Sequence, residues 1–121
     1  MAHVDAHYQY DAALKSIEAY IEKRPEDLFG RNFRGFILYR KGRDADAAQA
    51  FVAALSLEPD NCYAHYYLAY VYARRYNDAS SLDPRRNGFL KRHREHVAKT
   101  RSFRDTHPYQ QLISYFFTIH P

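Results

Sequence analysis

The sequence has few of the residues and segments that mark several protein classes. Its single cysteine, Cys62, cannot form an internal disulfide, so we expect a reducing compartment. No apolar run approaches the roughly 20 residues that a membrane-spanning helix needs, and the N-terminus lacks the charged and apolar blocks of a signal peptide. These absences predict a cytoplasmic protein without a membrane partner.

Motifs that mark enzymes are also missing. The four glycines suit packing or turn positions, and none belongs to a phosphate-cradling loop. The sequence has no nucleophile elbow and no paired-acid arrangement. The pairs His3/His7 and His93/His96 each offer two ligands, which do not make a metal site. We therefore expect no enzyme activity, no metal and no cofactor.

Charge is spread unevenly along the chain. Residues 1–73 carry eight Lys/Arg and ten Asp/Glu, whereas residues 74–105 carry ten and four. The last sixteen residues carry none of these side chains. The chain thus has a mildly acidic zone, a strongly basic zone and a neutral aromatic zone.

The sequence also repeats itself at a period of 34 residues. This shift places residues 11–27 over 45–61, and residues 28–45 over 62–79. Small, apolar and turn residues coincide in the pairs Ala13/Ala47, Ile17/Phe51, Ile21/Leu55, Pro25/Pro59, Gly35/Ala69, Arg40/Arg74 and Asp44/Asp78.

The repeat resembles the tetratricopeptide repeat (TPR) family, whose unit is a pair of antiparallel helices. Counted from Leu28, the family's small, turn, aromatic and proline positions are taken by Gly35, Gly42, Ala47, Phe51, Ala54 and Pro59. The next unit continues the pattern with Leu68, Ala69 and Tyr72. The resemblance covers residues 11 to about 79 and implies an all-α fold, in which helical hairpins stack as a short right-handed superhelix.

We expect one TPR-like domain over residues 1–121, with a divergent C-terminal helix pair. Its parts are a half repeat at 11–27, a repeat at 28–61, the first helix of the next repeat at 62–79, a displaced basic helix within 80–105 and an aromatic capping helix within 106–121. Proline cannot continue a helix, so Pro25 and Pro59 mark two helix ends. The predicted helices are 8–24, 28–41, 45–58, 61–76, 87–103 and 109–119.

Asp44 and Asp46 suit the start of the third of these helices, either as caps or by facing its positive end. Beyond residue 79 the repeat pattern fails, and Asp83-Pro84 predicts a turn. In the basic helix, Leu90, His93, Val97 and Thr100 share one face and predict its buried side.

Half of the twelve tyrosines lie between Cys62 and Tyr76. His65, Leu68, Ala69 and Tyr72 form one helical stripe, which we expect to pack against neighbouring helices. The opposite stripe and its equivalents one repeat earlier are, by the resemblance, the residues that line the concave groove of the superhelix. They are Phe29, Asn32, Phe33, Phe36, Tyr63, Tyr66, Tyr67 and Tyr70.

Aromatic rings with polar handles suit a peptide-binding surface, and we expect another protein's peptide or helix to bind there. Packing between helices is the alternative use of the same rings. A carboxylate clamp is not expected, because Phe36, Tyr63 and Tyr67 stand at its positions. Arg40 and Arg74 would meet an acidic residue of the ligand or point into solvent.

The basic segment, residues 85–104, leaves three alternatives: a solvated face, an acidic protein partner and nucleic acid. We favour the solvated face, because no nucleic-acid recognition motif accompanies the charges. The aromatic segment 109–117 is expected to cap the last repeat, to contact a second copy of the chain, or to meet a further repeat outside this sequence.

These expectations combine into a protein–protein interaction module with an aromatic groove. The alternative within the same class is a small dedicated chaperone, like the repeat-built chaperones of bacterial secretion systems. Nucleic-acid binding through the basic helix is the alternative from another class.

Overall fold

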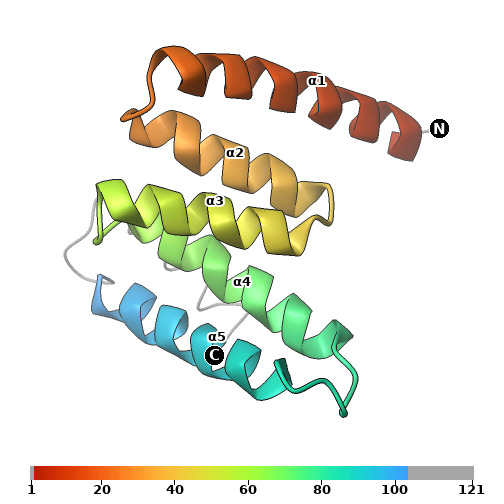
Figure 1. Cartoon of the computed structure of the whole chain (residues 1–121), viewed down its shortest axis with the longest axis vertical. Helices are drawn as coiled ribbons and strands as arrows, with labels where there is room; N and C mark the ends of the chain where they lie inside the picture. The colour runs from red at the N-terminus through yellow and green to blue at the C-terminus, as the bar shows by residue number, and fades with distance from the viewer. Residues whose placement is uncertain (1, 104–121) are drawn as a thin grey trace. The chain divides into compact units, whose positions relative to one another are not determined.

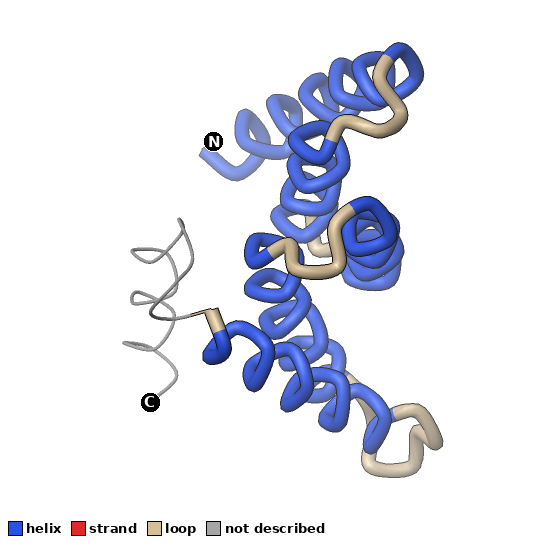
Figure 2. Tube along the Cα trace, turned by 90° about the vertical axis from the view of Figure 1, so that its left-hand side faces the viewer, coloured by secondary structure: helices blue, strands red, loops and turns tan. Residues whose placement is uncertain are grey.

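The computed structural model describes residues 2–103, and side chains from residue 9 onward. This part of the chain is all-α, with helices joined by short loops and no strand (Figures 1 and 2). The helices are α1 (Ala2–Lys23), α2 (Leu28–Arg40), α3 (Asp44–Leu57), α4 (Cys62–Asp78) and α5 (Arg86–Ser102). The first five predicted helices are thus confirmed, except that α1 begins at Ala2 and not at residue 8. The predicted helix at 109–119 lies outside the described residues.

The chain divides into two compact units, residues 1–59 and residues 60–121. The first unit contains α1, α2 and α3, and the second contains α4 and α5. Each unit is described by itself below.

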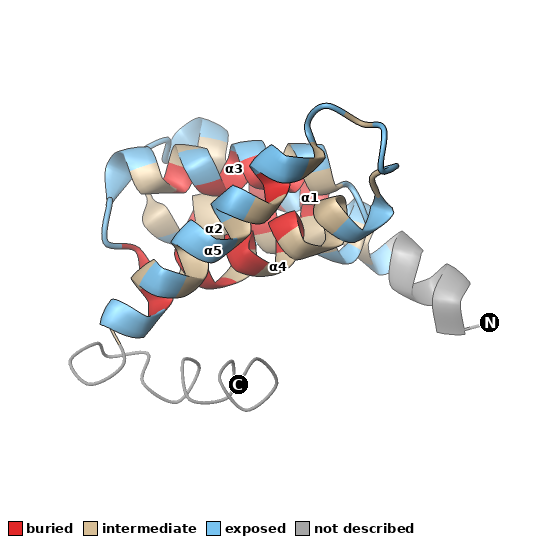
Figure 3. Ribbon diagram, turned by 90° about the horizontal axis from the view of Figure 1, so that it is seen from below, coloured by how far each residue is buried: buried red, intermediate tan, exposed pale blue. Residues whose placement is uncertain are grey.

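In the first unit, α2 packs against α1 on one side and α3 on the other. Ile37, Leu38 and Phe51 are fully buried, as are the small residues Ala47 and Ala54. Figure 3 colours the buried parts of the helices red and the exposed parts pale blue. Small side chains let two helices approach closely. Gly35 shows how close this approach is, because a Cβ atom there would lie 2.7 Å from the Phe51 ring.

Local sequence sets both ends of α2. The carboxylate of Asp27 accepts a hydrogen bond from the Gly30 amide at 3.4 Å and one from the Tyr20 hydroxyl at 2.7 Å. The Tyr20 hydroxyl is the main reason why the pKa of Asp27 lies below its usual range. At the other end, Gly42 has φ of 78°, and the next amide, of Arg43, donates to the Leu38 carbonyl. This is a Schellman motif, in which glycine avoids the strain of the left-handed conformation.

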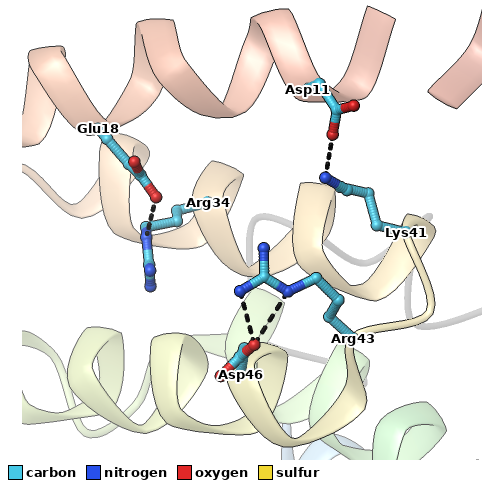
Figure 4. A network of polar contacts seen from close by, with 6 residues as sticks. All are labelled: Asp11, Glu18, Arg34, Lys41, Arg43 and Asp46. Atoms are coloured by element: carbon cyan, nitrogen blue, oxygen red, sulfur yellow. Dashed lines mark hydrogen bonds and ion pairs between the residues drawn. The ribbon is translucent and has the colours of Figure 1, made fainter. Parts of the chain in front are cut away.

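Several ion pairs lie on the surface of the first unit (Figure 4). Arg34 of α2 pairs with Glu18 of α1, and Lys41, directly after α2, pairs with Asp11 of α1. The Arg43 side chain pairs with Asp46 at 2.8 Å in the first turn of α3. Asp44 and Asp46 therefore follow the second of their two expected roles, because no side chain caps α3 and both face its positive end.

In the second unit, α4 and α5 form a tightly packed hairpin. The side of α5 that meets α4 carries Phe89, His93, His96 and Thr100. The expected buried side of α5 was therefore wrong at Leu90, which lines an open surface depression with Lys91 and Arg94. Phe89 is the buried apolar residue instead, because it stacks on Tyr72 with ring centroids 6.3 Å apart.

The failure of the repeat after residue 79 has a geometric basis. Helix α4 has 17 residues where the equivalent α2 has 13, so it continues for about one further turn. The longer connection to α5 contains the expected turn at Asp83-Pro84, where the Asp83 carboxylate accepts bonds from the Arg85 amide and guanidinium. The longer helix and the longer connection both shift the start of α5 along the chain.

Candidate functional site

Three phenylalanines form a row along α2, which we call the α2 aromatic row: Phe29, Phe33 and Phe36. The rings of Phe29 and Phe33 stack with centroids 5.6 Å apart and planes 12° apart. Phe36 extends the stack, 6.2 Å from Phe33. Phe29 is 62% exposed and Phe33 is 38% exposed, whereas Phe36 is half-buried. Two large apolar rings are thus held side by side in contact with solvent.

Neighbouring polar side chains border the α2 aromatic row. Tyr20 of α1 meets Phe29 edge to face, with ring centroids 6.2 Å apart. Arg40 lies one turn beyond Phe36, and its Nε donates to the Tyr10 hydroxyl at 3.0 Å. Asn32 is half-buried and sits beside the row in the helical register. Tyr20 thus contacts one end of the row, and Tyr10 links α1 to Arg40 near the other end of α2.

On α4 the expected site residues form what we call the α4 tyrosine cluster: Tyr63, Tyr66, Tyr67 and Tyr70. Tyr66 meets Tyr67 edge to face at 4.9 Å and Tyr70 at 5.3 Å. Tyr63 adds a tilted contact to Tyr67 at 5.2 Å. Tyr63, Tyr67 and Tyr70 are half-buried. Edge-to-face pairs of this kind stabilise each other by about 0.5–1.5 kcal/mol beyond their burial.

Tyr66 differs from its expected exposure. Its side chain is only 4% exposed and forms a core cluster with Ala69, against which Tyr67, Tyr70 and Val97 of α5 pack. Tyr66 is therefore part of the core of the second unit and not an exposed ring of the site. The opposite stripe of α4 packs as expected, since His65, Leu68, Ala69 and Tyr72 are all buried.

Several cations of the strongly basic zone, residues 74–105, make contacts inside the second unit. Arg92 lies over the Tyr72 ring at 5.8 Å, and Arg75 lies over the Phe89 ring at 4.3 Å. Lys99 pairs with Asp60 at 3.1 Å. Such contacts use guanidinium and ammonium groups as packing elements over aromatic faces. Lys91 and Arg94 point instead into the depression on the exposed side of α5.

Arg74, the last of the expected site residues, is half-buried near the end of α4. The structure therefore groups the expected residues into two sets, one on α2 and one on α4, each within its own unit. Cys62, at the start of α4, is fully buried, and burial raises the pKa of its thiol to about 11. Within the described residues, no three His, Cys, Asp or Glu side chains gather to hold a metal ion.

No protein-family model matches the chain, and a search for similar curated proteins finds none with significant similarity. Among residues 2–103, no helix combines the length and apolar character needed to cross a membrane. The repeat and the site consequently rest on the residues and their geometry.

Proposed function

We propose that the protein is a TPR-like interaction module that binds a peptide or helix of another protein along the α2 aromatic row, and that the α4 tyrosine cluster is a second contact surface for a partner. The observation that carries the proposal is the exposure of Phe29 and Phe33 in one ordered stack. Stacked apolar rings kept in water are typical of a surface that a partner covers.

The helix boundaries support the repeat assignment on which this proposal rests. Leu28 and Cys62, the first residues of α2 and α4, are 34 positions apart, as are their capping residues Asp27 and Asn61. Each of these helices packs against the next one in the chain, α3 or α5. We propose that the hairpins α2–α3 and α4–α5 are two consecutive units of a right-handed superhelix.

Site-specific crosslinking tests the proposed surface. A photoreactive phenylalanine analogue placed at Phe33 is expected to capture one dominant protein partner from the native lysate, identified by mass spectrometry. The same analogue at Gln49, an exposed position of α3, is the matched control. Equal capture from the two positions would contradict the proposal.

The captured partner then allows an affinity test. Phe29→Ala and Phe33→Ala should each weaken binding by about 1–3 kcal/mol, as truncated aromatic anchors do. Leu82→Ala removes a side chain that is 90% exposed in the loop before α5, and it should leave affinity unchanged. Unchanged affinity in both phenylalanine variants would place the site elsewhere.

The two alternative functions are tested by two further assays. A dedicated chaperone should self-associate or lose stability without its client, which sedimentation of the free protein detects. Nucleic-acid binding should appear as a salt-sensitive complex with a generic oligonucleotide that Lys91→Glu and Arg94→Glu abolish. These two positions are better probes than Arg92 or Lys99, whose side chains contact Tyr72 and Asp60.

A further inference from the structure

Two histidines from neighbouring helices meet inside the α4–α5 hairpin. The Nδ1 atoms of His65 and His96 lie 2.9 Å apart, and the two ring centroids lie 5.2 Å apart. His65 is 8% exposed, and the ring of His96 stacks on Tyr72 with planes 3° apart. Two ring nitrogens at this distance form a hydrogen bond only if one donates and the other accepts. At least one of the two imidazoles must therefore be neutral.

The charged groups around this pair disfavour protonation. Burial lowers the pKa of His96 to about 4, and the positive charges of His65, Arg92 and His93 act in the same direction. The other titratable and charged side chains nearby come from α4, from α5 and from the loop before α4. Tyr72 stacks on His96, Arg75 and Arg92 lie over the Tyr72 ring, and His93 contacts the Ala69 carbonyl. Lys99 lies over Phe103, whose ring is 6.2 Å from that of His65, and the loop adds Asp60. Within this set the one carboxylate, Asp60, pairs with Lys99.

We propose that the His65–His96 contact is a proton-sensitive latch on the α4–α5 hairpin: the closed hairpin holds His96 neutral, and acid favours opening because His96 can take up a proton once the hairpin has opened. Protonation of both rings would place two N–H donors against each other and leave two positive charges inside the hairpin. The latch goes beyond the proposed binding function and does not depend on it.

The direction of the pH effect follows from the lowered pKa of His96. The folded state takes up this proton less readily than the unfolded state, in which His has its ordinary pKa of 6.5. The contribution of the contact to stability is therefore complete above that value and is lost as the pH falls from 6.5 toward about 4. Between pH 7 and pH 5 the unfolding equilibrium constant should rise about 20-fold from this group.

A third histidine of the same hairpin provides the matched control. The Nδ1 atom of His93 lies 2.7 Å from the carbonyl oxygen of Ala69, so this nitrogen must donate. A protonated imidazole still carries that N–H, and the contact survives acidification. His93 and His96 thus both connect α5 to α4. The His93 contact needs a proton on Nδ1, whereas the His65–His96 contact needs one Nδ1 without a proton.

The test compares chemical unfolding of the wild type, His96→Gln and His93→Gln at pH 7 and pH 5. Glutamine at position 96 retains a hydrogen-bonding amide but does not titrate. We expect the acid-induced rise in the unfolding constant to be about 20-fold smaller in His96→Gln than in the wild type, and to be retained in His93→Gln. Equal acid sensitivity in the wild type and His96→Gln would overturn the latch.

A measurement on the wild type covers the case in which His96→Gln fails to fold. Titration of the imidazole signals by NMR should show His96 still neutral at pH 5.5, and amide exchange of α4 and α5, corrected for intrinsic rates, should accelerate at pH 5 more than that of α2 and α3. Titration of His96 near its ordinary pKa, or equal acceleration in both units, would refute the proposal.

Discussion

Phe33 of α2 and Tyr67 of α4 hold equivalent positions one repeat apart, but their surroundings differ. Phe33 is exposed and stacks in the α2 aromatic row, with Phe29 and Phe36 on either side along the helix. Tyr67 is half-buried and packs edge to face on Tyr66. On α2 the rings are stacked, and Phe29 and Phe33 stay exposed. On α4 the rings of Tyr67 and Tyr70 meet Tyr66 edge to face, and Tyr66 is buried.

The two sets also differ at the position between their aromatic rings. Asn32 and Tyr66 are equivalent in sequence, 34 residues apart. In α2 this position carries a short polar side chain, and the phenylalanines beside it form a row. In α4 it carries a large ring, which Tyr67, Tyr70 and Val97 cover. Equivalent positions of the repeat thus carry an exposed row in one helix and a packed cluster in the other.

Removing the ring at the centre of each set should give the largest difference between them. Tyr66→Ala is expected to lower the free energy of unfolding by about 3–5 kcal/mol, because it leaves a cavity in a packed cluster. Phe33→Ala should change it by less than about 1 kcal/mol, since most surface truncations have small effects. Urea unfolding of both variants measures the difference, and equal losses would show that the two sets are packed alike.

The small residue of the repeat offers a second test. Gly35→Ala should destabilise the protein by about 1–3 kcal/mol, because its new Cβ atom would overlap the buried Phe51 ring. The equivalent position in α4 already holds Ala69, which is buried without such an overlap. Thermal unfolding would measure the effect, and a stabilised Gly35→Ala variant would mean that Phe51 moves aside readily.

The helix caps extend the comparison to backbone hydrogen bonds. Asn61 accepts the Ala64 amide at 3.3 Å and is buried, so Asn61→Ala should cost about 1 kcal/mol. Loss of amide protection confined to the first turn of α4 would identify the cap as the cause. Asn61→Asp keeps an acceptor oxygen and serves as the control variant.

Low pH should weaken the cap of α2 but not that of α4, because the Asp27 side chain can be protonated and the equivalent Asn61 side chain cannot. The Tyr20 hydroxyl lowers the pKa of Asp27 from 3.8, so the carboxylate's contribution to stability is present above pH 3.8 and is lost as the pH falls through the lowered value. Asp27→Asn should therefore remove an acid-dependent part of stability that Asn61→Ala leaves in place. Unfolding curves at pH 5 and pH 3 would show this, and an unchanged pH profile in Asp27→Asn would contradict it.

The smallest effect is expected for the surface ion pairs. Glu18→Gln removes the partner of Arg34, whose Nε lies 3.4 Å from the carboxylate in a partly exposed pair. Exposed pairs of this kind contribute about 0.2–1 kcal/mol, and salt screens them. Denaturation at low and high salt should find a change below about 0.5 kcal/mol that vanishes at high salt. A larger, salt-independent loss would assign Glu18 a packing role on α2.

The helices were predictable because their signals are local. Pro25 and Pro59 follow helices that end at Lys23 and Leu57, and the small and aromatic residues recur with one period. The packing stripe of α4 was predictable for the same reason. Phe89 and the His65–His96 contact were not, because the longer α4 and the longer connection set the rotation and position of α5.

The sequence by itself determined the all-α character of the described chain, the positions of its helices and the 34-residue register that makes α2 and α4 equivalent. Propensity, capping and proline placement act within a few residues, so they can be read from the chain alone. Only the tertiary structure decided which aromatic rings are exposed, that Gly35 meets Phe51, and that two histidines share one hydrogen bond. These features depend on contacts between separate helices, where distances of a few tenths of an ångström decide whether groups pack, bond or repel.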